Sequence, residues 1–125
     1  NTNDYRESSA YYIAKELLEN GANLLIHDPQ VSYEQIKLSL EVFVQKVKNE
    51  NRISFSNNLN EAFHNADAII ILTEWEIYKK LNWKKIAPTL RHPSWIFDTR
   101  SIINKSEVKD VGINIWRVGD GQSFS

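Results

Sequence analysis

The segment Asp67–Trp75 constrains the fold more than any other part of this chain. It contains Ala68-Ile69-Ile70-Ile71-Leu72, a run of five apolar residues of which three are β-branched. Polar residues close both ends of the run. The run is too short to span a membrane and lacks the periodicity of a surface helix. We therefore predict a strand that is buried on both faces, as in the interior of a parallel sheet.

Polar residues follow this strand directly, in Thr73-Glu74-Trp75. Open α/β sheets bind ligands beyond the carboxyl ends of their strands, so this tripeptide is a candidate binding segment. A purely structural interpretation remains open, in which Thr73 caps the next helix and Trp75 packs in the core.

The remaining pattern alternates strands with helices. The predicted strands are Ala22–His27, Ile53–Phe55, Asp67–Leu72, Trp95–Phe97 and Asn114–Val118, and the predicted helices are Ser8–Asn20, a short one that Asn58 and Glu61 open as a capping box, Glu76–Leu81 and Trp83–Leu90. Tyr33–Asn49 mixes both signals and is predicted to be partly helical. Such alternation indicates right-handed βαβ units, hence a Rossmann-like three-layer α/β sandwich with a mostly parallel sheet.

The predicted sheet lacks one strand. In a doubly wound sheet of order 3-2-1-4-5-6, the first strand is central and precedes the first helix, here Ser8–Asn20. No residues before Ser8 are apolar enough to form it. We therefore expect this chain to be cut from a longer one, with the first central strand outside it. Ala22–His27 and Asp67–Leu72 would then flank a gap of about 10 Å, or two strand spacings.

Composition excludes several classes of function. The 125 residues, 42% of them hydrophobic, suffice for one ordinary domain, and the net charge of -1 does not suggest a nucleic-acid partner. Cys is absent, which excludes disulfides, thiolate metal sites and a Cys nucleophile within this chain. No apolar run approaches the roughly 20 residues of a membrane span, and Asn1–Asp4 does not resemble a signal peptide.

Common catalytic and cofactor motifs are also missing. The His residues lie far apart, so we predict no metal site, and no Ser occupies a nucleophile-elbow pattern. The acidic residues are scattered and are interpreted as solvated charges. A dinucleotide site needs Gly at the first strand-to-helix turn, yet Asn1–Ser9 contains none. Asp28 follows a strand where a ribose-binding acid would stand, but we interpret it as a turn former before Pro29.

Two arginines are candidate anion-binding residues. Arg6 lies beside the start of the first helix, and Arg100 follows the strand Trp95–Phe97 at its carboxyl end. The guanidinium group stays charged and can donate two parallel hydrogen bonds to a phosphate. A surface salt bridge is the alternative for each. The lysines between Lys79 and Lys85 are most simply a solvated helix face.

Three segments taken together suggest a family. Asn3-Asp4-Tyr5-Arg6-Glu7-Ser8-Ser9, Thr73-Glu74-Trp75 and Phe97-Asp98-Thr99-Arg100 occur here in an order and spacing that resemble the carboxyl-terminal, UDP-binding domain of the UDP-glucose/GDP-mannose dehydrogenase family. The likeness extends through Ile26–Val31 and covers nearly the whole chain, so we expect residues 1–125 to form this one domain. The motif set is more similar to family members that act on UDP-glucose than to those that act on UDP-N-acetylmannosamine or GDP-mannose.

The resemblance implies an NAD-dependent cytoplasmic enzyme that oxidises UDP-glucose to UDP-glucuronate in two steps. It implies that Arg100 contacts the UDP-sugar and that Arg6 reaches NAD held mainly by the amino-terminal domain. The catalytic Cys, the helical dimerisation core and a substrate-contacting Phe-Lys pair would lie outside this chain, before Asn1. The isolated chain should therefore be inactive, and its partners should be UDP-glucose, the rest of its polypeptide and further copies in a homodimer or higher oligomer.

Other functions remain open. The chain could be a non-catalytic nucleotide-binding or subunit-contact module, or part of a dehydrogenase for another nucleotide sugar. A phosphoacceptor receiver domain would use Asp28 as acceptor, with Thr73 and Arg100 as switch residues. Receivers also need an acidic pair for Mg²⁺, for which the first loop offers only Asp4 and Glu7. Titration with a phosphodonor and Mg²⁺ would separate a receiver domain from a UDP-binding domain.

Overall fold

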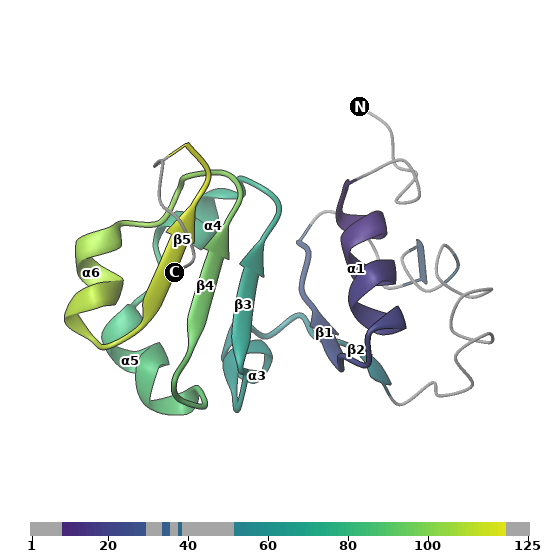
Figure 1. Ribbon diagram of the computed structural model, residues 1–125, viewed down its shortest axis with the longest axis horizontal. Helices are drawn as coiled ribbons and strands as arrows, with labels where there is room; N and C mark the ends of the chain where they lie inside the picture. Colours follow the sequence, from purple (N-terminus) through teal and green to yellow (C-terminus); the bar gives the residue numbers. More distant parts are fainter. Residues whose placement is uncertain (1–8, 30–33, 36–37, 39–51, 120–125) are drawn as a thin grey trace. The chain divides into compact units, whose positions relative to one another are not determined.

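The computed structural model describes residues 9–29, 34–35, 38 and 52–119 (Figure 1). It divides into two compact units, Asn1–Ala62 and Phe63–Ser125, which we describe separately. Most of Tyr33–Asn49, predicted to be partly helical, lies outside the described residues, and so does Arg6.

Unit 1 contains the helix α1 (Ser9–Glu19) and two short parallel strands, β1 (Leu24–Ile26) and β2 (Ile53–Phe55). The predicted apolar stripe of α1 is confirmed where it is described, since Leu18 is fully buried and Ala14 is buried. Gly21 ends the helix with a φ of 95°, a left-handed conformation that Gly adopts without a Cβ penalty. The Ala22 N–H then donates to the Leu17 carbonyl at 3.0 Å, which satisfies an orphan carbonyl of the last turn.

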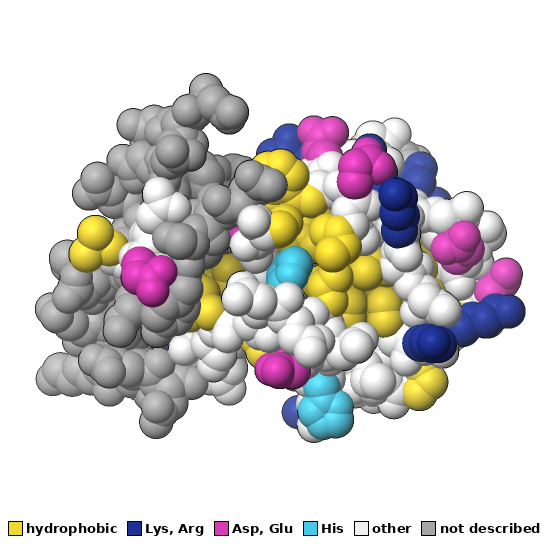
Figure 2. Space-filling model, turned by 180° about the vertical axis from the view of Figure 1, so that it is seen from behind, with side chains coloured by type: hydrophobic (Ala, Val, Ile, Leu, Met, Phe, Trp, Pro, Cys, Tyr) yellow, Lys and Arg dark blue, Asp and Glu magenta, His cyan; other side chains and the backbone are white. Residues whose placement is uncertain are grey.

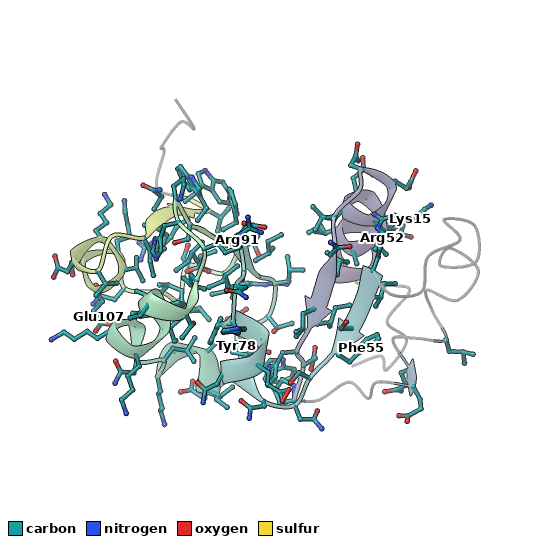
Figure 3. The ribbon with its side chains drawn as sticks, turned by 90° about the horizontal axis from the view of Figure 1, so that it is seen from below. Lys15, Arg52, Phe55, Tyr78, Arg91 and Glu107 are labelled. Atoms are coloured by element: carbon teal, nitrogen blue, oxygen red, sulfur yellow. The ribbon has the colours of Figure 1, made fainter. Side chains whose placement is uncertain are left out.

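Arg52 ties β2 to the end of α1. Its Nη2 donates to the carbonyls of Leu18 and Ala22, and its Nε donates to the Ala22 carbonyl at 3.2 Å. A cation at a helix carboxyl terminus also meets the negative end of the helix dipole. Figure 3 labels Arg52 in unit 1, together with Lys15 of α1. No local pattern in the sequence predicts this contact, because its partners lie 30 or more residues before Arg52.

Asn58 caps the helix α3 (Leu59–Phe63), which crosses the boundary between the units. Its Oδ1 accepts from the N–H groups of Asn60 at 2.8 Å and Glu61 at 3.4 Å. The reciprocal half of the predicted capping box is wrong. The Asn58 N–H donates to Ser56 Oγ at 3.0 Å, and the Ser56 hydroxyl, instead of the Asn58 N–H, donates to the Glu61 carboxylate.

Unit 2 is a parallel sheet of three strands in the order β3-β4-β5, with helices between the strands. Its elements are β3 (Ala68–Ile71), α4 (Glu76–Lys79), α5 (Trp83–Ile86), the 3₁₀ turn η3 (Ala87–Thr89), β4 (Trp95–Asp98), α6 (Lys105–Asp110) and β5 (Asn114–Arg117). Because the strand order advances in one direction, right-handed crossovers put all these helices on one face. Figure 3 shows that arrangement, with Tyr78 of α4 and Glu107 of α6 on the same side of the sheet.

The core of unit 2 lies between the sheet and these helices. The register places Ile69, Ile96 and Ile115 side by side on the covered face, and Ile96 is fully buried there. Val108 of α6 and Trp83 of α5 are buried as well. The outer side of this helical layer carries charged groups around a hydrophobic area (Figure 2), and Ile77 of α4 is 47% exposed.

The prediction that Asp67–Leu72 is buried on both faces is wrong. Ile71 is buried, but Ala68 is exposed and Ile70 is 37% exposed. The reason is the position of β3, which pairs only with β4 among the described residues and is covered by helices on one face. The apolar side chains on the other face of β3 have no covering element in the described part of unit 2.

The predicted strands and the helices before residue 91 match the observed ones to within about two residues, but α6 was not predicted. Asn104 begins this helix, and its Oδ1 accepts from the N–H groups of Ser106 and Glu107. The sequence could have indicated this helix, because Asn104 followed three residues later by Glu107 is a typical pattern at a helix amino terminus.

The strand order β1-β2 and β3-β4-β5 agrees with the predicted order on each side of the missing strand. The described strands form two separate sheets, and no pairing joins β1 to β3 among them. The width of the gap, and the strand that would fill it, stay predictions.

We predict that Arg52→Ala lowers the free energy of unfolding by about 1.5–3 kcal/mol, because backbone carbonyls at the end of α1 lose a charged donor. Arg91→Ala is the matched control, since the Arg91 Nε lies 3.5 Å from the Asp67 carboxylate in a pair that is 67% and 76% exposed. Such exposed pairs contribute about 0–1 kcal/mol. Urea unfolding of both variants measures the difference, and equal losses would contradict the role given to Arg52.

Candidate functional site

The candidate site is the carboxyl edge of the sheet in unit 2, formed by the turn after β4 and the segment after β3. The turn is built around Asp98, the last residue of β4, which is fully buried. Its Oδ1 accepts from the Arg100 N–H at 3.0 Å, and its Oδ2 accepts from the N–H groups of Ile102 and Ile103, each at 2.8 Å. Three donors on one carboxylate fix the path of the turn.

Asp98 contradicts the interpretation of every acidic residue as a solvated charge. A signal for its burial exists in the sequence, because Asp98 lies two residues after the buried Ile96 on the same face of a strand. Burial of a carboxylate is costly unless hydrogen bonds compensate it, and here the turn supplies them.

Thr99 joins the turn to β3. Its N–H and its Oγ1 both donate to the Ile71 carbonyl, at 3.1 and 2.7 Å. The N–H bond extends the ladder between β3 and β4 by one residue beyond Asp98, and the hydroxyl reinforces it. The start of the turn is therefore held against the end of β3.

Arg100, predicted to bind the substrate, lies at this edge. Its Nε donates to the Leu72 carbonyl at 3.0 Å, so the side chain reaches across from β4 to the end of β3. Its Nη1 is 3.9 Å from a Glu74 carboxylate oxygen, beyond hydrogen-bond length, and the two side chains are 41% and 64% exposed. The Nη groups have no hydrogen-bond acceptor among the described residues and can meet an anionic ligand.

Ser101 completes the turn in a strained conformation. Its φ of 55° lies in the left-handed region, which costs a non-Gly residue roughly 1–2 kcal/mol. The Ser101 hydroxyl donates to the Val118 carbonyl at 2.7 Å, and the Val118 N–H donates to the Asp98 carbonyl at 3.0 Å. The turn is thus tied to the end of β5 as well as to β3.

The segment Thr73–Trp75 lies at the same edge, after β3. Trp75, and not Thr73, is the N-cap residue of α4, and no side chain caps that helix. The indole Nε1 of Trp75 is buried without an acceptor among the described residues. The interpretation of Thr73 as a helix cap is therefore wrong.

The other residues singled out by the sequence lie elsewhere. Asp28 follows β1 in unit 1, after His27. The lysines of α4 and α5 are exposed, and Lys79 pairs with Glu76 one turn earlier at 3.0 Å. Hydrogen bonding and the charge of Lys79 hold the pKa of Glu76 below its usual value. These observations fit a solvated helix face.

The described part of the chain shows neither a metal-binding cluster nor a membrane-spanning helix. Residues 9–29 and 52–119 contain no group of three or more His, Asp or Glu side chains that could hold a metal ion. Within the same part of the chain, no helix has the length and apolar character needed to cross a membrane.

Parallel strands joined by helices, with a positioned arginine at the carboxyl edge, define a Rossmann-like α/β domain suited to an anionic ligand. Residues 1–105 match the model of the UDP binding domain of the UDP-glucose/GDP-mannose dehydrogenase family. The chain belongs to this family, as its UDP-binding domain.

Individual relatives agree with this assignment. The chain is 34% identical over 119 residues to the UDP-glucose 6-dehydrogenase of Caenorhabditis elegans and 37% identical over 124 residues to that of Gallus gallus. These matches cover 95% and 94% of this chain but 25% of each relative. UDP-glucose 6-dehydrogenase 4 of Arabidopsis thaliana is 33% identical over 94% of this chain. The chain thus spans about a quarter of the length of these relatives.

A solved structure supports the fold. The NDP-N-acetyl-D-galactosaminuronic acid dehydrogenase of Methanosarcina mazei Go1 superposes with a TM-score of 0.51 at 18% identity, over 88% of this chain and 28% of that chain. The Rossmann-like fold class predicted from the sequence is confirmed.

His27 generates a prediction about pH. Burial lowers the pKa of His27 below its usual value, against the opposing influence of the Asp28 charge. As pH falls through the unfolded value of about 6.5, the unfolded chain binds this proton more readily than the folded chain. Stability should therefore fall from pH 7.5 to pH 5.5, and by less in His27→Gln. Urea unfolding at both pH values measures this, and an equal or larger loss in His27→Gln would contradict the shift.

Proposed function

We propose that this chain is the UDP-sugar-binding domain of an NAD-dependent UDP-glucose 6-dehydrogenase. The full-length protein would oxidise the C6 alcohol of UDP-glucose to the carboxylate of UDP-glucuronate in two steps, with two NAD. The observation that carries the proposal is the position of Arg100, fixed through Nε on the Leu72 carbonyl with its Nη groups at the carboxyl edge of a parallel sheet. The family match and the names of the relatives support UDP-glucose as the substrate.

The chemistry of Arg100 fits a nucleoside diphosphate. A guanidinium group binds phosphate oxygens through paired N–H donors, and the bond from Nε removes part of the entropy cost of ordering this long side chain. Among the described residues, Glu74 is the acid that pairs with the Arg100 guanidinium, but at 3.9 Å and 64% exposed it is a weak competitor. A doubly charged diphosphate would displace it.

The remaining parts of the enzyme would come from outside this chain. The chain contains no Cys, so a thiol-dependent oxidation would need a Cys from another part of the polypeptide. NAD would be held mainly by an amino-terminal domain, with Arg6 reaching it from this one. The isolated 125 residues would bind UDP but be inactive. The full-length protein would be cytoplasmic and form a homodimer or higher homo-oligomer.

Two alternatives make different predictions. A dehydrogenase for another nucleotide sugar would use the same turn but accept UDP-N-acetylmannosamine or GDP-mannose. A non-catalytic nucleotide-binding or subunit-contact module would bind nucleotide without turnover. Turnover assays of the full-length protein with each sugar nucleotide and NAD separate these cases.

We predict that Arg100→Ala in the full-length protein weakens UDP-glucose binding by roughly tenfold or more, since truncation of a charged hydrogen bond costs about 1.5–3 kcal/mol. The control is Arg91→Ala, which removes another exposed arginine of unit 2 away from the turn. Isothermal titration of UDP-glucose measures both. Unchanged affinity and KM in Arg100→Ala would overturn the assignment.

The proposed role of Arg6 predicts a different kinetic signature. If Arg6 contacts NAD held by another domain, Arg6→Ala should raise the KM for NAD and leave UDP affinity near the unmodified value. Steady-state kinetics with NAD varied, together with UDP titration, distinguish the two effects. A loss of UDP affinity with an unchanged KM for NAD would mean that the two arginine roles are exchanged.

A further inference from the structure

We propose that Asp98 is a positioning residue for UDP binding, which acts through Arg100 and does not touch the nucleotide. The inference deepens the function proposed above and rests on it. It assigns a purpose to the most deeply buried charged side chain among the described residues of unit 2.

Position 98 lies on the buried face of β4, where packing alone does not require a charged residue. In β4, Ile96 and Asp98 occupy the same face, and both are fully buried. A carboxylate there needs several hydrogen bonds to offset the loss of hydration. The structure supplies three, all from backbone N–H groups of the turn that carries Arg100. The carboxylate therefore orders that turn, which an apolar residue could not do.

Arg100 is held at both its ends. Its backbone N–H is fixed on Asp98 Oδ1 at 3.0 Å, and its Nε is fixed on the Leu72 carbonyl at 3.0 Å. Between Asp98 and Arg100, the N–H and the hydroxyl of Thr99 both donate to the Ile71 carbonyl, which fixes the backbone there. With these bonds in place, the Nη groups remain the part of the guanidinium that can turn toward a ligand.

Loss of the Asp98 contacts would release Arg100 without removing its charge. The turn would lose its acceptors for Arg100, Ile102 and Ile103, and the strained Ser101 would relax. The side chain could then approach the nearby Glu74 carboxylate, which competes with an anionic ligand. UDP binding would then have to order the turn again, and this unfavourable free-energy change would lower the affinity for UDP.

A double-mutant cycle tests the proposal, with UDP as the titrated ligand and the full-length protein as the sample. Asp98→Asn keeps the shape of the side chain but replaces one acceptor oxygen by a donor, so at least one N–H of the turn faces no acceptor. We expect the Kd for UDP to rise about tenfold. A change of this size lies within the range of interaction energies measured between residues of one hydrogen-bond network. In the Arg100→Ala background, Asp98→Asn should change the Kd by less than about twofold.

Thr99 provides a second test if Asp98→Asn does not fold. Thr99→Val removes the hydroxyl donor to the Ile71 carbonyl at nearly constant volume, and Thr99→Ser retains it. We expect Thr99→Val to weaken UDP binding several-fold in an Arg100-dependent manner and Thr99→Ser to restore it. The matched control for Asp98→Asn is Asp110→Asn, because Asp110 is an exposed acid at the end of α6.

The outcomes separate the proposals. Weaker UDP binding that disappears in the Arg100→Ala background supports the positioning role. A lower melting temperature with an unchanged Kd, or the same loss of affinity in both backgrounds, overturns it. If Arg100→Ala itself leaves the Kd unchanged, the proposed function of Arg100 fails, and the inference about Asp98 fails with it.

Discussion

The buried Asp98 carboxylate accepts hydrogen bonds from three backbone N–H groups, and the carboxyl edge of unit 2 depends on this interaction. It fixes the turn after β4, and that turn is tied to β3 through Thr99 and to β5 through Ser101. The sheet provides rigid strand ends, and the carboxylate provides the geometry between them. Arg100 thereby gains a defined position although its side chain is long and 41% exposed. Sites of this kind are more accurately held than sites on unsupported loops.

The parts of this edge that the sequence predicted are those that depend on local pattern. Uninterrupted apolar residues located β3, and the arginine three residues after the apolar Trp95-Ile96-Phe97 located Arg100. Asp98 was misjudged because the predicted strand ended at Phe97, so the two-residue spacing from Ile96 that places Asp98 on the covered face was not applied to it. The contact of Arg52 with the end of α1 spans 30 or more residues of sequence, so no local pattern could reveal it.

The exposed face of β3 has a related explanation. The run from Ala68 to Leu72 has the composition of a strand covered on both faces, yet Ile70 is 37% exposed and β3 pairs only with β4 among the described residues. Among the described residues of unit 2, the helices cover one face of β3, so the apolar side chains on its other face are left exposed.

We propose that the turn after β4 holds Arg100 in place to meet the diphosphate of a UDP-sugar. A crystal structure of the full-length protein with UDP would show whether it does. We expect Arg100 Nη atoms about 2.7–2.9 Å from diphosphate oxygens, with Nε still on the Leu72 carbonyl and the turn unchanged. UDP bound elsewhere, or a guanidinium that leaves Leu72 and a turn that rearranges on binding, would contradict it.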